Sequence, residues 1–213
     1  MLSNVDFDLD NHLPLIAILR GITPQDVVRV AEILISEGYS MIEVPLNSPN
    51  AIESIKLLSA AYNKTCYVGA GTVTSKELVK EVIAAGANLV VTPNLNDDVV
   101  TLSLEANCIV FPGVATPTEA FSALALGATG IKLFPVSVLG LDGFKALKAV
   151  LPEQTICLPV GGIEPIEESM RPLLNIGAKG FGLGSSLYKP GMSDETIRQN
   201  ARDYVTAFHL ANQ

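Results

Sequence analysis

The chain is poor in the residues that mark several common protein classes. Among its 213 residues there is no tryptophan, there are two histidines and three cysteines, and aromatic side chains account for 6%. Although 48% of the residues are hydrophobic, no apolar run approaches the roughly 18 consecutive residues of a membrane-spanning helix. The sequence therefore predicts a protein with no membrane partner, whose apolar residues form core strands and buried helix faces.

Disulfides, metal sites and a secretory signal are not indicated either. Cys66, Cys108 and Cys157 are isolated in strand-like segments without metal-ligand spacing, so we expect reduced thiols in the core. Residues 1–6 have neither the basic start nor the apolar stretch of a signal peptide, which favours a cytoplasmic location. His12 and His209 lie near the ends of the chain, and we assign neither a catalytic role.

Positive charge is scarce as well. Lys and Arg number 14 against 22 Asp and Glu, and the net charge of −8 argues against nucleic acid as the main partner. A small anionic substrate is still compatible, because a few basic groups in a cleft can outweigh the overall charge. No linker rich in Ser, Pro or Gly divides the chain, so residues 1–213 are expected to form a single domain.

What the chain does contain is a regular alternation of short Val, Ile and Leu runs with amphipathic segments. The predicted strands are 15–20, 41–45, 66–70, 89–92, 108–111, 130–134, 156–160 and 180–183, and the predicted helices are 24–36, 50–62, 75–85, 97–105, 117–126, 141–150, 165–176 and 194–211. Such alternation is typical of a parallel sheet covered by helices, and eight units predict a closed (β/α)8 TIM barrel. An open doubly wound sheet is the alternative, but its single crossover point and Gly-rich first turn are missing.

Local signals at the helix ends agree with this pattern. Thr23-Pro24 and Thr116-Pro117 each place a capping hydroxyl before a proline at a first helical position. Four glycines, which permit the left-handed turn that ends a helix, stand before predicted strands at positions 38, 86, 127 and 177. Residues 1–12 are expected to form a short helix that closes the bottom of the barrel.

Lys132 is the only charged residue in the apolar strand 130–134. Burial disfavours the ammonium form, which lowers the pKa of the lysine and frees an amine nucleophile of the kind that forms Schiff bases. Strand alternation turns Glu43 and Arg20 toward the same interior. The structural alternatives are a lysine that extends to solvent or pairs with Glu43 as a counter-ion, and an Arg20 exposed in a loop because Gly21 ends its strand.

Glycines follow the last two predicted strands. Gly161 and Gly162 come after the seventh, and Gly184 and Ser185 come after the eighth. Their backbone N–H groups would approach a phosphate closely, and a short helix beginning after Gly184 would point its positive end at it. The alternative is that these glycines only serve turns that need positive φ.

The chain resembles the class I 2-keto-3-deoxy-6-phospho-sugar-acid aldolases over about residues 13–188. The segments that carry the resemblance are IAILRG (16–21), IEVPLNSP (42–49), GAGTV (69–73), VTP (91–93), FPG (111–113), IKLFP (131–135) and VGG (160–162). The resemblance implies a homotrimer without metal or cofactor. Its substrate would be a phosphorylated keto-deoxy sugar acid.

The resemblance also implies roles for individual residues. Lys132 would form the Schiff base with the C2 ketone, and Glu43 would shuttle protons through a bound water. Thr72 would lie near the carboxylate that ends up in pyruvate. The other implied contacts are Arg20 to the substrate, Pro93 and Phe134 to the pocket wall, and Gly161, Gly162, Gly184 and Ser185 to the phosphate.

Two positions depart from the gluconate-type members of this family. Asn47 stands where those members carry arginine, and Val160 stands where they carry threonine. Both segments look like those of the members that cleave 2-dehydro-3-deoxy-6-phosphogalactonate, the C4 epimer, to pyruvate and glyceraldehyde 3-phosphate. The alternatives are a gluconate-type aldolase, a metal-free phosphosugar isomerase or epimerase that does not need Lys132, and a non-catalytic phosphosugar sensor.

Overall fold

The computed structural model describes residues 1–5 and 7–213, and in that part of the chain strands and helices alternate. The strands are β1 (Leu15–Ile18), β2 (Met41–Pro45), β3 (Tyr67–Gly71), β4 (Leu89–Val91), β5 (Ile109–Phe111), β6 (Gly113–Val114), β7 (Ile131–Leu133), β8 (Cys157–Pro159) and β9 (Phe181–Leu183). The helices are α1 (Val27–Ser36), α2 (Ala51–Tyr62), α3 (Lys76–Ala84), α4 (Asp97–Glu105), α5 (Pro117–Ala125), α6 (Val136–Lys148), α7 (Glu167–Ile176) and α8 (Asp194–Ala211).

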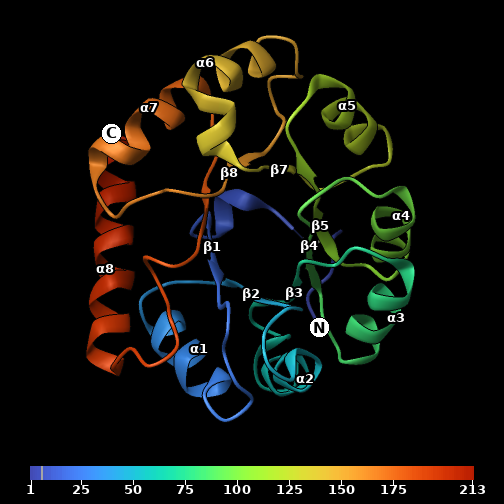
Figure 1. The fold of residues 1–213 in the computed structure, drawn as a ribbon, viewed down its shortest axis with the longest axis vertical. Helices are drawn as coiled ribbons and strands as arrows, with labels where there is room; N and C mark the ends of the chain where they lie inside the picture. The colour runs from blue at the N-terminus through green and yellow to red at the C-terminus, as the bar shows by residue number, and fades with distance from the viewer. Residues whose placement is uncertain (6) are drawn as a thin grey trace.

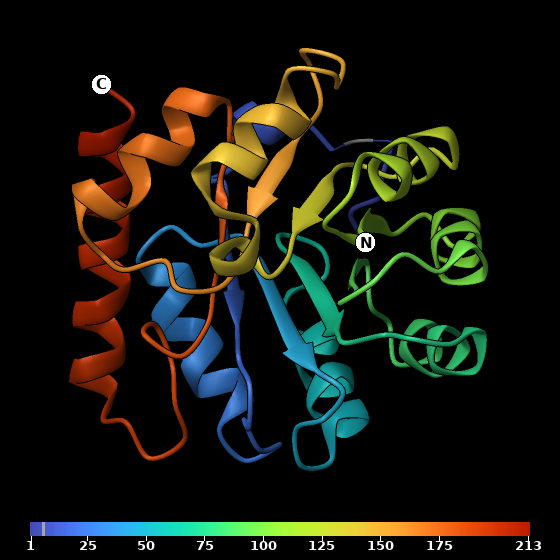
Figure 2. The same cartoon turned by 45° about the horizontal axis from the view of Figure 1, so that its top comes forward.

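The strands form two parallel sheets. One has the order β5-β4-β3-β2-β1-β9, and the other has the order β6-β7-β8. An isolated parallel bridge between Val160 and Gly182 lies between β8 and β9. The strands occupy the centre of the molecule with the helices around them (Figure 1), and their arrows run in a common direction (Figure 2). The predicted parallel α/β fold is confirmed.

Strand side chains alternate between two apolar environments, as the sequence pattern predicts. Ile42 and Val44 of β2 belong to the main core between strands and helices. Met41 of the same strand belongs to a smaller cluster on the other side, with inward side chains of β1, β3, β4, β5 and β8. Buried residues on both faces are typical of a parallel sheet, and they fix which side chains face the interior.

Several predicted helix ends are confirmed. Thr116 and Glu119 form a capping box at the start of α5. The four glycines before strands have φ values of 96°, 89°, 87° and 117° at positions 38, 86, 127 and 177. The prediction at Thr23 was wrong: its hydroxyl donates to the Asp26 carboxylate, residues 24–26 form a turn, and α1 begins at Val27.

Two further boundaries differ from the prediction. The strand at 108–111 continues beyond Pro112 as β6. In α6 an additional helical segment begins at Val136 and ends at a break at Gly140 (φ 69°, ψ 174°), and the predicted helix follows from Leu141. The N-terminal segment contains one 3-10 turn, Leu9–Asn11, in place of the expected helix, and residue 6 of that segment lies outside the described residues. Leu2, Phe7 and Leu9 pack against the inward-facing cluster, so the expected closure at this end is present.

The remaining structural expectations concern the cysteines and membrane spans. All three cysteine thiols are free and buried. No helix in the described part of the chain is both long and apolar enough to span a membrane.

Candidate active site

Lys132 and Glu43 lie in the interior, as strand alternation predicts. Lys132 is in the middle of β7 and is 7% exposed, while Glu43 is in the middle of β2 and is 2% exposed. Their sequence neighbours Ile131, Leu133 and Ile42 point the other way, into the helix layer. The two ionisable groups therefore come from different sheets and share one buried space.

The Glu43 carboxyl is poised to exchange protons near neutral pH. Burial raises its pKa to about 7, although the positive charges of Lys132 and Arg20 act in the opposite direction. Its Oε2 atom has no hydrogen-bond partner among the described residues. Gly71 of the neighbouring strand makes room for it, because a Cβ at Gly71 would overlap the carboxylate. A tightly placed carboxyl with this pKa suits a general acid and base.

The pKa of the Lys132 amine is lowered, which is the direction that nucleophilic catalysis needs. Burial lowers its pKa, the Glu43 carboxylate raises it, and Arg20 lowers it further. Its Nζ lies 4.6 Å from the centroid of the Phe134 ring. The aromatic face and the carboxyl hold the amine in one place, and its low exposure favours loss of its proton.

Arg20 lies at the rim of the site, so its predicted place in the interior was wrong. β1 ends at Ile18. Its hydrogen-bond ladder with β2 extends only to a bond from the Leu19 amide to the Glu43 carbonyl. Arg20 lies in the turn that follows. The side chain is exposed, and its Nη1 donates to Oδ1 of Asn47 at 2.6 Å. Asn47, itself exposed, therefore orients a guanidinium whose charge still reaches Glu43 and Lys132.

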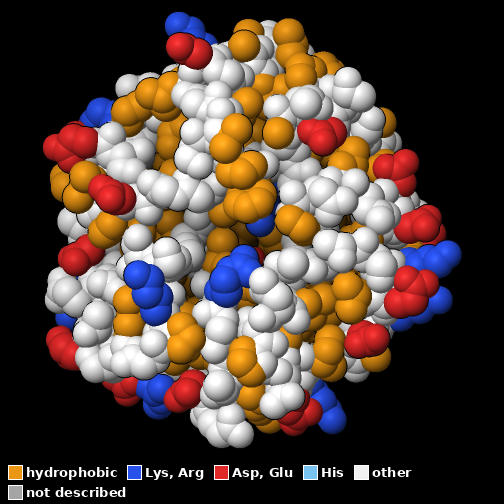
Figure 3. Space-filling model, viewed as in Figure 1, with side chains coloured by type: hydrophobic (Ala, Val, Ile, Leu, Met, Phe, Trp, Pro, Cys, Tyr) orange, Lys and Arg blue, Asp and Glu red, His pale blue; other side chains and the backbone are white. Residues whose placement is uncertain are grey.

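A cavity of about 180 Å³ joins Arg20 to the predicted phosphate residues. Its walls are Ile18, Arg20, Phe134, Val160, Gly161, Gly162, Ile163, Gly182, Gly184, Ser185 and Ser186. Four lining residues were not among the predicted site residues: Ile18, Ile163, Gly182 and Ser186. Strand alternation from Arg20 would have found Ile18, and adjacency to Ser185 would have found Ser186. Figure 3 shows a hollow near the middle of this face with basic side chains in and beside it.

The two glycine segments differ in detail from the prediction. Gly161 and Gly162 have φ values of 104° and 75°, and a Cβ at either position would meet only open space. The helix predicted after Gly184 is absent: residues 185–187 form one turn, because the amides of Leu187 and Tyr188 both donate to the Gly184 carbonyl. At Gly161, Gly162 and Gly184 the cavity wall therefore offers exposed backbone, which suits an anion.

Thr72, Pro93 and Asn47 adjoin the site without lining this cavity. Thr72 directly follows β3 and has φ 61°, a left-handed conformation that is a true outlier for a β-branched residue and is typical of functional sites. Pro93 is the second residue after β4, and a Cβ at Gly113, the ladder partner of Lys132, would overlap its backbone. Asn47 therefore contacts Arg20, Pro93 lies against the ladder partner of Lys132, and Thr72 is the chain neighbour of Gly71.

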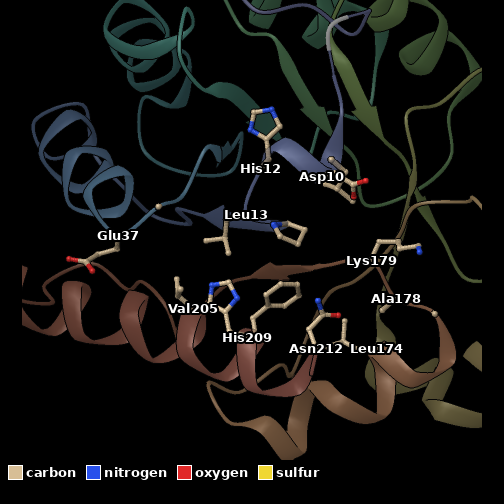
Figure 4. Close-up of a pocket in the computed structure, with 15 residues that line it drawn as sticks. Asp10, His12, Leu13, Glu37, Leu174, Ala178, Lys179, Val205, His209 and Asn212 are labelled. Carbon is tan, nitrogen blue, oxygen red and sulfur yellow. The ribbon is translucent and has the colours of Figure 1, made fainter.

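A larger cavity, of about 670 Å³, lies at the opposite ends of the strands (Figure 4). Its walls come from the segments before β1 and β9, from the turn after α1, and from α7 and α8. The His12 ring points away from this cavity: its Nδ1 lies 2.9 Å from Ser40 Oγ, and the Phe7 ring stacks on the His12 ring. Because proteins with parallel sheets covered by helices place their chemistry at the carboxyl ends of the strands, the smaller cavity beside Lys132 is the candidate site.

Metal binding is not indicated by the donor groups. Among residues 1–5 and 7–213, no three His, Cys, Asp or Glu side chains are grouped so that they could hold an ion.

Known proteins with similar sequences and structures agree with this site. A family model described as KDPG and KHG aldolase matches residues 8–207. A probable 2-dehydro-3-deoxy-6-phosphogalactonate aldolase of Rhizobium meliloti (strain 1021) is 44% identical over 92% of this chain and 91% of its own. The 2-dehydro-3-deoxy-6-phosphogalactonate aldolase of Escherichia coli (strain K12) is 43% identical over 94% of this chain and 97% of its own.

A solved structure described as native KDPGal superposes with a TM-score of 0.90, at 43% identity over 93% of this chain and 96% of that chain. These similarities confirm the predicted aldolase, which is a lyase. They favour an aldolase over the two alternatives, a phosphosugar isomerase and a non-catalytic sensor. The chain belongs to the family of KDPG and KHG aldolases.

Proposed function

We propose that this aldolase cleaves 2-dehydro-3-deoxy-6-phosphogalactonate to pyruvate and glyceraldehyde 3-phosphate through a Schiff base on Lys132. The observation that carries the proposal is the burial of Lys132 and Glu43 in one interior, where the pKa of the amine is lowered and the pKa of the carboxyl is raised to about 7. The names of the two relatives, which cover nearly the whole chain, support this substrate.

The reaction begins with attack of the Lys132 amine on the C2 ketone. Loss of water leaves an iminium, which acts as an electron sink. Glu43 accepts the proton of the C4 hydroxyl, the C3–C4 bond breaks, and its electron pair forms an enamine as glyceraldehyde 3-phosphate departs. The Glu43 carboxyl then returns a proton to C3, and hydrolysis of the iminium releases pyruvate and restores the lysine.

The remaining residues would bind the two charged ends of the substrate. Backbone amides of Gly161, Gly162, Gly184 and Ser185 would hold the phosphate in the 180 Å³ cavity, beside Arg20. Thr72, strained at the end of β3 and adjacent to Gly71, would bind the carboxylate. This arrangement orients C2 toward Lys132 and C4 toward Glu43.

Selectivity for the C4 epimer would come from Val160 and from the pair of Arg20 and Asn47. Val160 is 7% exposed and lines the cavity, where its methyl groups offer no hydrogen bond to a substrate hydroxyl. The alternative substrate is the gluconate epimer. Comparison of kcat/KM for both epimers separates the two, and a higher value for the gluconate epimer would reject the galactonate assignment.

We further propose that the two sheets form one closed (β/α)8 barrel within a single domain of residues 1–213. The Val160–Gly182 bridge supports closure at β8 and β9, and bonds from the Lys132 amide to Pro112 O and from the Thr129 amide to Val110 O support it at β7. The family resemblance suggests a cytoplasmic homotrimer. Exposed apolar side chains on α6, such as Val138 at 82%, fit a subunit contact.

Borohydride trapping tests the mechanism directly. We expect that reduction in the presence of pyruvate attaches a pyruvate-derived group to the peptide that contains Lys132, as measured by mass spectrometry. The same treatment without pyruvate is the control. A folded protein that cleaves the substrate but forms no such adduct would exclude the Schiff base.

A further inference from the structure

The two reacting side chains belong to different sheets, so their separation depends on how the sheets are joined. Glu43 is on β2 of the six-stranded sheet, and Lys132 is on β7 of the three-stranded sheet. Residues 109–114 run from one sheet into the other, because β5 pairs with β4 and β6 pairs with β7. Pro112, which has no N–H group, separates β5 from β6.

At this crossing a hydroxyl takes the place of a backbone acceptor. In the ladder of β4 and β5, the amide of Ile109 donates to the carbonyl of Asn88, and the amide of Thr92 donates to the carbonyl of Phe111. A regular parallel ladder would next place the amide of Gly113 on the carbonyl of Thr92. The Gly113 amide instead donates to Thr92 Oγ1 at 3.2 Å, and that hydroxyl in turn donates to the carbonyl of Asn94.

Gly113 transmits this bond to Lys132. The two residues are direct ladder partners, and the amide of Lys132 donates to the carbonyl of Pro112 at 2.9 Å. On its other side Gly113 has no freedom to move toward β4, because even a Cβ there would overlap the backbone of Pro93. The Thr92 hydroxyl therefore fixes the position of β6, the strand with which the backbone of Lys132 pairs.

Thr92 is placed to act only through the backbone. Leu89 and Val91 of the same segment belong to the inward-facing cluster, and Val90 belongs to the helix-layer core. By this alternation Thr92 faces the helix layer, and it is 0% exposed. We infer that Thr92 is a positioning residue whose hydroxyl sets the distance between Lys132 and Glu43, an inference that rests on the proposed Schiff-base function.

The chain offers a matched control at the opposite end of the same segment. Thr129 Oγ1 accepts from the amide of Val110 at 3.0 Å, so it too replaces a backbone acceptor beside β5. It precedes β7 and belongs to the end that lies away from the cavity. Thr129→Val removes the same atom and the same kind of accepted bond as Thr92→Val, whereas Thr92→Val also removes the bond that Thr92 Oγ1 donates to Asn94.

The experiment compares kcat, KM, thermal unfolding and the rate of pyruvate trapping for both variants. We expect Thr92→Val to lower kcat and the trapping rate about tenfold while KM changes less than about twofold, because a small displacement of a reacting group slows chemistry more than binding. Thr129→Val is expected to lower Tm similarly but to retain wild-type kcat. Thr92→Ser, which keeps the hydroxyl, is expected to restore kcat.

Other outcomes overturn the inference. A wild-type kcat in Thr92→Val, equal losses of kcat in both Val variants, or failure of Thr92→Ser to recover activity would each assign Thr92 a purely structural role. Thr92→Ala provides the same comparison if the Val variant does not fold. Absence of trapping in the wild-type enzyme would instead reject the proposed function, so the two failures are distinguishable.

Discussion

The amino ends and the carboxyl ends of the strands differ in the side chains that occupy the interior. At the amino ends, apolar and aromatic side chains fill the interior: Phe7 packs edge-on against Tyr67 at 5.2 Å and Phe111 at 6.2 Å, and residues from the N-terminal segment cover them. At the carboxyl ends, the interior holds Lys132 and Glu43 beside a cavity. The comparison indicates that one end stabilises the fold while the other tolerates unfavourable groups that do chemistry.

Asn88 and Glu43, two buried polar residues, show the same contrast. Asn88, which is fully buried at the amino ends, accepts from the amide of Val68 at 2.7 Å and donates to the carbonyls of Leu2, Asn63 and Cys66. Glu43 at the carboxyl ends has an oxygen without a partner among the described residues, and Thr72 is in a strained conformation. Unsatisfied groups of this kind persist where a substrate supplies the missing contacts.

Lys132→Arg is expected to give the largest effect. A guanidinium keeps its proton at neutral pH and cannot attack a ketone, so turnover and borohydride trapping should both be lost, by more than about 10⁴-fold in kcat. Circular dichroism and thermal unfolding check that the fold persists. Measurable cleavage by a folded Arg variant would contradict the assignment of Lys132 as nucleophile.

Glu43→Gln should have the next largest effect on activity and an opposite effect on stability. The amide cannot exchange the proton, so kcat should fall about 10²- to 10⁴-fold. Glu53→Gln, an isosteric change at an exposed position of α2, is the control and should leave kcat unchanged. A kcat within about threefold of wild type would remove Glu43 from the mechanism.

The pH dependence of unfolding sharpens this comparison. The folded-state pKa of Glu43 is raised from 4.5 to about 7, so between these values the folded state binds a proton that the unfolded state has released. Stability contributed by Glu43 is therefore present below about pH 4.5 and declines as pH rises to about 7. The Tm difference between Glu43→Gln and wild type should grow in favour of the variant over this range, and a constant difference would contradict the raised pKa.

Gly71→Ala should have an intermediate effect. The new methyl group would overlap the Glu43 carboxylate, so the carboxylate must move, and we expect kcat to fall about 10- to 100-fold. Gly143→Ala within α6 is a suitable control, because its Cβ meets only the side chain of Leu139. An active Gly71→Ala variant would show that Glu43 can work from a second position.

Much of the fold follows from local sequence signals. The bounds of β2, α4 and α8 agree with the predicted ranges, because apolar periodicity and flanking polar residues define them without reference to distant segments. Strand alternation also identified Lys132 and Glu43 as interior groups, since the period of two is a property of the strand itself.

Two of the errors arose where a distant partner decides the structure. Arg20 was expected in the interior, but the ladder at the end of β1 stops one residue earlier and Asn47 holds the guanidinium at the rim. The continuation of the fifth strand past Pro112 depends on pairing with β7, and the hydroxyl of Thr92 matters only in that register. Neither feature has a local signal in the sequence.

Phe7→Ala should have the smallest effect on activity and a clear effect on stability. Phe7 is partly buried and packs on the rings of Tyr67, Phe111 and His12, so its truncation should lower the free energy of unfolding by about 2 kcal/mol. Phe7→Leu, which keeps apolar contact area, should lose less. Because these contacts lie at the amino ends of the strands, kcat and KM should stay within about twofold of wild type in steady-state assays. A loss of kcat that exceeds the fraction unfolded would mean that the two ends are energetically coupled and that the interior works as one unit.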